Sequence, residues 1–185
     1  MIKEIMADAR DRMEKTIDSL QADLRSIRTG RASPALVEKL NVEYYGSPTP
    51  LIQLAGVTVP EPRMLMIRPW DRATLGIIEK AILKSDLGLT PNNDGQAIRL
   101  ILPQLTEERR RDLNKQVARR VEEARVSARN IRRDAIDMLR DAEKEKLIDE
   151  DDLHKGQEQA QELTDKFIKQ IDEVGKAKEA EILEG

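Results

Sequence analysis

A long stretch in the second half of the chain alternates apolar and polar residues with the period of a helix. Residues 107–146 contain neither Gly nor Pro, and two apolar lanes run through most of the stretch at seven-residue spacing. The first lane is Val117, Ala124, Ile131 and Met138, and the second is Val121, Ala128, Ala135 and Ala142. A repeat of seven is typical of a helix packed lengthwise against partners in a left-handed bundle. The pattern predicts one helix over 107–146, roughly 60 Å long.

Two further segments carry the same repeat and need partners for their apolar stripes. Residues 2–28 place Met6, Met13, Leu20 and Ile27 seven apart, with Ile17 and Leu24 between them. A last helix, to about Leu183, places Leu153, Ala160, Phe167 and Val174 seven apart, with Leu163 and Ile171 between them. Asp149–Asp152 supplies N-caps and negative charge at its start. We therefore expect residues 1–29 and 106–185 to form one three-helix bundle.

The segment between these helices has a different composition. All eight prolines and most of the nine glycines lie between residues 30 and 105. The expected strands are Asn41–Tyr45, Leu54–Val59, Arg63–Ile67 and Ala97–Leu102, in which Val57, Val59, Leu65 and Ile67 alternate. The expected helices are Ala35–Leu40 and Thr74–Lys84, and Asn92–Gly95 is a turn signal. The fold class is thus α+β: an elongated three-helix bundle with an inserted small β/α/β domain over residues 31–105.

Two short connections join the predicted domains, and together they predict a hinge. They lie near 29–31 and 103–106 and consist of Thr29, Gly30 and Arg31 on one side and Pro103, Gln104, Leu105 and Thr106 on the other. Gly30 also suits the end of the first helix, because glycine tolerates the left-handed conformation found there.

Composition excludes several classes of chemistry. The chain has no Cys, so it has no disulfide and no thiol nucleophile, which suits the cytoplasm. The only His is His154, which we expect to be a solvated surface residue. We find no nucleotide-binding, hydrolase or metalloprotease motif, and Asp149–Asp152 lacks the glycine and final glutamate of a calcium loop. No signal segment or apolar run of membrane-spanning length is present. We expect no enzyme activity, cofactor, metal or membrane.

Charge is distributed unevenly along the chain. Residues 109–133 carry 10 Lys+Arg against 3 Asp+Glu, a net +7, whereas residues 134–185 carry 8 against 17, a net −9. Arg125, Arg129 and Arg132 fall within about 60° of one another on a helix, away from the apolar lanes, so we expect them to be exposed. Aligned guanidinium groups suit phosphates, and the scarcity of aromatics favours a folded RNA backbone over stacked single strands. The alternative is a solvated face with ion pairs such as Glu122–Arg125 or Arg133–Asp137.

Several motifs resemble those of a known family, the bacterial ribosome recycling factors. They cover essentially the whole chain: Leu24-Arg25-Ser26-Ile27-Arg28-Thr29-Gly30-Arg31-Ala32, Tyr44-Tyr45-Gly46, Ile67-Arg68-Pro69-Trp70-Asp71, the run from Ser85 to Gly95, Leu105-Thr106-Glu107-Glu108-Arg109-Arg110, and the run from Ala128 to Ala135. Against the family pattern, only Gly76 looks unusual.

The resemblance implies an L-shaped, tRNA-sized monomer with a flexible elbow between its domains. It implies a non-enzymatic translation factor that binds the ribosome after termination and, with elongation factor G and GTP, promotes subunit splitting and release of mRNA and tRNA. It also implies contacts between the bundle and large-subunit ribosomal RNA. The matching arginines are Arg110, Arg129 and Arg132, with Arg28, Arg31 and Arg133 as further candidates; the charge pattern adds Arg125.

A second hypothesis explains the heptads without RNA. A structural coiled-coil adaptor would bind protein helices, form homodimers and show no dependence on RNA. A hydrolase is a third and weaker hypothesis, because no catalytic site can be assembled from the sequence.

Overall fold

The computed structural model describes all residues, 1–185, and its internal contacts divide the chain into two compact units. The first, the bundle, comprises residues 1–28 and 107–183; the second, the small unit, comprises residues 29–106 with 184–185. None of the helices is both long enough and apolar enough to cross a lipid bilayer.

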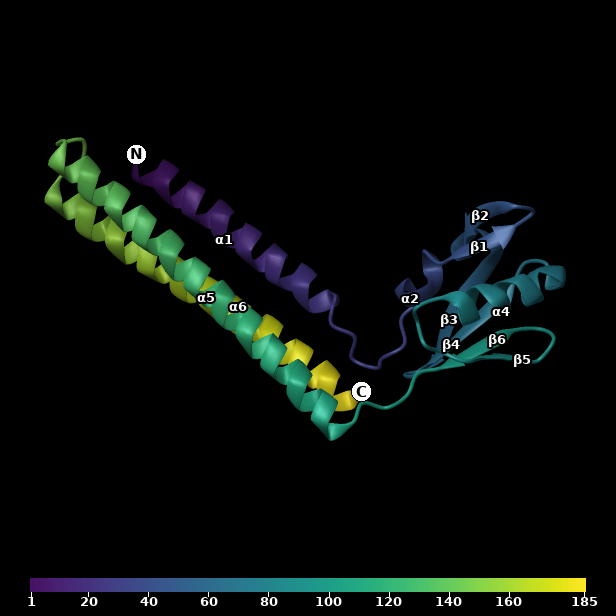
Figure 1. Ribbon diagram of the computed structural model, residues 1–185. Coiled ribbons are helices and arrows are strands. Elements are labelled where there is room, and N and C mark those ends of the chain that lie inside the picture. The colour runs from purple at the N-terminus through teal and green to yellow at the C-terminus, as the bar shows by residue number, and fades with distance from the viewer. The chain divides into compact units, whose positions relative to one another are not determined.

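Three long helices form the bundle (Figure 1): α1 (Ile2–Arg25), α5 (Glu107–Lys144) and α6 (Glu150–Glu184). Helices α1 and α6 both run antiparallel to α5. Helix α1 is shorter than the predicted 2–28, because Ser26 ends it: the Ser26 hydroxyl donates to the Asp23 carbonyl at 2.6 Å. Such a local side-chain bond competes with continuation of the helix.

The buried face of α5 follows the predicted lanes except at one position. Val117, Val121 and Ile131 are buried as expected, but Met138 is 46% exposed and Leu139 is fully buried. An α-helix drifts by about 20° per heptad relative to a seven-residue repeat. After three heptads Met138 therefore lies at the margin of the core, and its neighbour occupies the centre.

The turn between α5 and α6 is closed by backbone bonds. Lys146 has a positive φ of 62°, and the amide of Leu147 donates to the carbonyl of Ala142 at 2.9 Å, the pattern of a helix C-terminal cap. Asp149 then caps α6 as predicted, because its carboxylate accepts from the Asp152 amide at 2.7 Å. Two glycines let α6 approach α5: a Cβ at Gly156 or at Gly175 would overlap the α5 side chains.

The small unit contains six antiparallel strands and short helices. A two-stranded hairpin pairs β1 (Asn41–Tyr44) with β2 (Ser47–Pro50). A four-stranded sheet has the order β3-β4-β6-β5, built from β3 (Ala55–Glu61), β4 (Met64–Pro69), β5 (Pro91–Asn93) and β6 (Ile98–Ile101). The helical segments are α2 (Ala35–Glu38), α3 (Leu51–Leu54), the 3-10 turn η1 (Arg72–Thr74) and α4 (Leu75–Lys84).

The core of the small unit lies between α4 and the sheet. Leu65 and Ile67 of β4 and Ile78 and Ile82 of α4 are almost completely buried. Val59 lies in β3 as predicted and is 38% exposed, near the point where the pairing of β3 with β4 becomes irregular, between Thr58 and Glu61. The α+β class, with a helical bundle and a small antiparallel sheet domain, is confirmed.

Candidate nucleic-acid interface

The candidate arginines lie mostly on α5, where packing fixes the helix and thereby the directions of its side chains. Arg129 and Arg133 are exposed, whereas Arg110, Arg125 and Arg132 are half-buried. Arg28 is exposed in the bundle, and Arg31 is exposed in the small unit, where it forms an ion pair of 3.4 Å with Glu184. Because α5 is continuous from Glu107 to Lys144, the α5 candidates belong to one rigid element.

Arg125 departs from the expectation of an exposed phosphate ligand. Its Nε donates to Asp172 of α6 at 2.8 Å, and its Nη1 donates to Glu122 at 3.0 Å. These hydrogen bonds to Asp172 and Glu122 raise the pKa of Arg125 above its ordinary value. The guanidinium joins α5 to α6, and its carboxylate partners neutralise it within the bundle. The predicted Glu122–Arg125 ion pair is therefore present.

Arg132 is held by a neutral partner instead. Its Nη1 donates to the Oε1 atom of Gln161 on α6 at 3.1 Å, and Gln161 in turn donates to Asp165 at 2.8 Å. A neutral amide orients the guanidinium without cancelling its charge. Arg132 can thus still offer charge-assisted hydrogen bonds to a phosphate.

Arg129 and Arg133 complete the part of the surface that keeps its positive charge. Arg129 has one long ion pair, 3.5 Å to Glu122, and its side chain is 45% exposed. Arg133 follows Arg129 by one helical turn and is exposed. We call Arg129, Arg132 and Arg133 the arginine triad; it is the part of the predicted surface best suited to phosphates.

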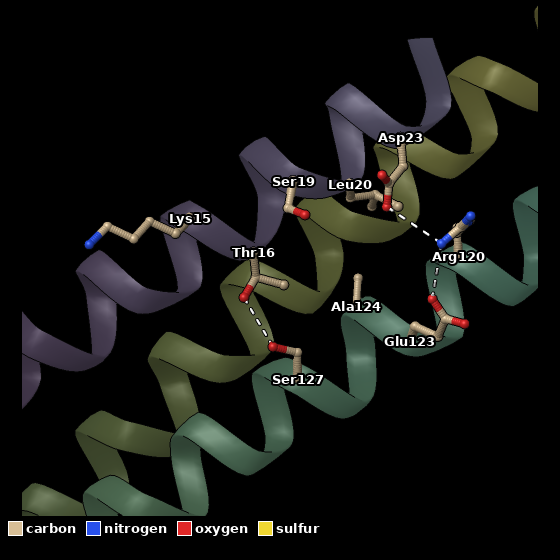
Figure 2. A pocket seen from close by; sticks show the side chains of 9 residues that line it. All are labelled: Lys15, Thr16, Ser19, Leu20, Asp23, Arg120, Glu123, Ala124 and Ser127. Atoms are coloured by element: carbon tan, nitrogen blue, oxygen red, sulfur yellow. Dashed lines mark hydrogen bonds and ion pairs between the residues drawn. The ribbon is translucent and has the colours of Figure 1, made fainter. Parts of the chain in front are cut away.

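The seam between α1 and α5 neutralises another part of the charge (Figure 2). Arg120 lies 3.9 Å from Asp23 of α1 and 3.7 Å from Glu123, and the hydroxyls of Thr16 and Ser127 lie 3.1 Å apart across the seam. A groove of about 310 Å³ accompanies these contacts. The net charge of +7 counted over residues 109–133 therefore overstates the positive charge that this surface presents. Asp23 of α1 and Asp172 of α6, which lie outside that stretch, form ion pairs with its arginines. Sequence alone carried no signal for these partners.

The predicted hinge residues surround Gly30. Gly30 has a φ of 78°, and a Cβ there would lie 3.4 Å from both the Leu105 side chain and the Pro103 carbonyl oxygen. The structure thus brings the two connections of the small unit side by side at this glycine. Thr29 is buried, whereas Gln104 and Thr106 are exposed.

Nowhere in the structure do three or more His, Asp or Glu side chains lie close enough together to hold a metal ion. His154 is 66% exposed beside Glu150, as expected for a surface residue. The candidate site is therefore described by its charged helical surface on α5.

The chain matches the family model described as ribosome recycling factor over residues 20–183. The chain belongs to the ribosome recycling factor family. It is 57% identical to the ribosome-recycling factor of Syntrophomonas wolfei subsp. wolfei over 184 residues, covering 100% of both chains. It is also 57% identical to that of Carboxydothermus hydrogenoformans, covering 99% of each.

Solved structures of the same family share the fold. A solution structure of the ribosome recycling factor is 42% identical, with a TM-score of 0.72, covering 100% of this chain and 98% of the other. A second structure describes the T. thermophilus ribosome recycling factor and the E. coli elongation factor G bound to the E. coli post-termination complex. This relative is 47% identical, with 99% of each chain covered and a TM-score of 0.63. As a member of this family, the chain is a translation factor and not an enzyme.

Proposed function

We propose that this family member binds the ribosome after termination and, with elongation factor G and GTP, promotes splitting into subunits and release of mRNA and tRNA. The observation that carries this proposal is the full-length similarity to ribosome recycling factors, one of which is described bound with elongation factor G to a post-termination complex. The absence of an assembled catalytic site in the chain agrees with a partner GTPase supplying the energy. Its place of action is the cytoplasm.

The arginine triad is the proposed anchor on large-subunit ribosomal RNA. Arg129 and Arg133 are exposed, and Gln161 holds Arg132 without neutralising it. Arg110, Arg28 and Arg31 extend the proposed contact. Arg125 has a different proposed role: bonded to Asp172, it fixes α6 against α5 and so holds Gln161 in position behind Arg132. Charge-assisted contacts to phosphates release counterions and make binding fall steeply with salt.

The hinge is proposed to let the small unit change its orientation while the bundle stays anchored. Residues that absorb backbone rotation allow such motion without contacting the ligand. Gly30, at positive φ beside Pro103 and Leu105, has the backbone freedom that this role needs.

Light scattering of purified post-termination ribosomes tests the proposed function. Splitting should require the factor, elongation factor G and GTP together, and omission of any one should abolish it. A non-hydrolysable GTP analogue distinguishes nucleotide binding from hydrolysis. Splitting that proceeds equally without elongation factor G would contradict the proposed mechanism.

The coiled-coil adaptor hypothesis is separated by two measurements on the same protein. The adaptor predicts a homodimer in analytical ultracentrifugation and no binding to ribosomes. The recycling proposal predicts a monomer whose ribosome affinity falls as salt rises.

A further inference from the structure

The β1–β2 hairpin has two outer edges with different hydrogen-bonding capacity. Tyr45 and Gly46 form its two-residue turn, both at positive φ, and Tyr44 pairs with Ser47 across it. In such a hairpin the pair next to the turn is hydrogen-bonded, and bonded and non-bonded pairs then alternate. The backbone groups of Asn41 and Glu43 therefore point away from β2.

The β2 edge cannot accept another strand in the same way. The residues opposite Asn41 and Glu43 are Pro50 and Pro48, and proline has no N–H to donate. Prolines at outward-facing positions protect an edge strand from further pairing. Asn41 and Glu43 are exposed and keep their N–H groups, so the hairpin is closed at β2 and open at β1.

A groove of about 500 Å³ lies between β1 and α4, two elements that Figure 1 shows within the small unit. Leu40, Ile77 and Ala81 supply apolar lining, and Lys80 and Lys84 line the α4 side. The two lysines are one helical turn apart, so both can reach one segment lying along the groove. The volume is in the range that accommodates small ligands and peptide side chains.

We propose that this groove binds an extended segment of another protein, which adds as a strand to the edge of β1. The backbone of the segment would bond to Asn41 and Glu43, an apolar side chain would lie on Leu40 and Ile77, and an acidic side chain would meet Lys80 or Lys84. Strand addition draws its affinity from backbone bonds and its specificity from alternate side chains. A peptide fits better than a nucleic acid, because the edge presents backbone amide and carbonyl groups in the alternation that another strand matches.

The test is a titration of the full-length, 15N-labelled protein with a short capped peptide of alternating valine and glutamate, followed by amide NMR. The expected result is saturable shifts of the Asn41 and Glu43 amides and slower hydrogen exchange at both. The same peptide N-methylated at alternate residues keeps its charge but loses backbone donors. It should bind more weakly by about tenfold or more.

Charge reversal provides the matched variants. Lys80→Glu with Lys84→Glu should weaken binding of the glutamate peptide and favour a valine–lysine peptide. Arg68→Glu with Arg72→Glu makes the same charge change at exposed residues of the small unit outside the groove and should leave binding unchanged. Absent shifts at Asn41 and Glu43 with millimolar peptide, or equal binding of the N-methylated peptide, would overturn the proposal. An RNA oligonucleotide that shifts these amides in place of the peptide would overturn it as well.

Discussion

The bundle and the small unit each place glycine inside a helix, but in opposite surroundings. A Cβ at Gly175 of α6 would lie 2.7 Å from the Cγ2 atom of Val121, and one at Gly156 would lie 2.8 Å from Leu139. A Cβ at Gly76 of α4 would meet nothing within 4 Å. The bundle thus uses glycine to let two long helices approach, whereas α4 packs through Ile78 and Ile82 and leaves its glycine in open space.

The polar contacts of the two units differ in how far apart the bonded residues lie in the sequence. In the bundle, Arg125 bonds to Asp172, 47 residues away, and Arg12 bonds to Asp134 at 3.0 Å, 122 residues away. In the small unit, Asp94 accepts from the amides of Gln96 and Ala97 within a single turn. The bundle therefore depends on contacts between distant segments, whereas turns of the small unit are fixed locally.

The largest expected effect comes from constraining the connections between the units. A disulfide between a cysteine at residue 29 or 30, which leaves Arg31 in place, and a cysteine in 103–106 has no native cysteine to compete with it. Ribosome binding should remain close to normal, because the arginine triad lies on α5, while most of the splitting activity should be lost because hinge motion is blocked. Binding and splitting are measured on the oxidised protein, with its reduced form as control.

Two results would decide against this division of roles. An oxidised protein that splits ribosomes at the normal rate would exclude a moving hinge. An oxidised protein that no longer binds would mean that the small unit contributes to docking.

Arg132→Ala should lower ribosome affinity by about tenfold to a hundredfold, because a hydrogen bond to a charged group contributes about 1.5–3 kcal/mol. The bundle should stay folded, since the substitution removes one hydrogen bond to Gln161, and such a bond contributes about 0.5–1.5 kcal/mol. Arg72→Ala, an exposed change in the small unit, is the control and should leave affinity unaltered. Sedimentation with ribosomes at several salt concentrations measures both. Normal affinity in a folded Arg132→Ala protein would remove that residue from the interface.

Gly175→Ala should destabilise the bundle by up to about 2 kcal/mol. The added methyl overlaps Val121, whose branched side chain has one preferred rotamer in a helix, and overpacking typically costs about 1–3 kcal/mol, less about 1 kcal/mol gained in helix propensity. Urea unfolding followed by far-UV circular dichroism gives the change. Val121→Ala should partly rescue Gly175→Ala, and simple additivity of the two would show that the close contact is not the cause.

Gly76→Ala should change stability in the opposite direction from Gly175→Ala, and should stabilise the small unit by about 0.5–1 kcal/mol. Alanine favours the helix, and the open space around Gly76 admits the methyl group without a clash. Trp70 is the only tryptophan, so its fluorescence reports unfolding of the small unit by itself. A loss of stability would mean that Gly76 has a backbone role that its surroundings do not reveal.

Sequence reasoning succeeded where a repeat fixed the environment and failed where distant residues met. The seven-residue lanes predicted the buried face of α5, and only the helical drift moved Met138 out and Leu139 in. Strand β2 was missed because Pro48 and Pro50 argue against a strand, although both tolerate an edge position. At the candidate site, the pattern placed the arginines on one helix but did not predict the neutralisation of Arg125, because Asp172 lies on a helix whose register the sequence alone does not give.

The smallest expected effect is confined to one turn of the small unit and depends on pH. The amides of Ala97 and Gln96, with the Arg99 side chain, lower the pKa of Asp94 from 3.8 to about 2. A lowered pKa in the folded protein adds stability that is fully present above the unfolded pKa and is lost as pH falls through the folded pKa. Asp94→Asn keeps an oxygen acceptor but not the charge. The free energy of unfolding of Asp94→Asn should therefore be lower than that of the native protein above about pH 4, and the difference should shrink towards pH 2. Urea unfolding followed by Trp70 fluorescence measures both proteins. Asp86→Asn, at an exposed aspartate of the same unit, controls for the change in net charge. A deficit that is the same at every pH would mean that the Asp94 carboxylate does not stabilise this turn through its charge.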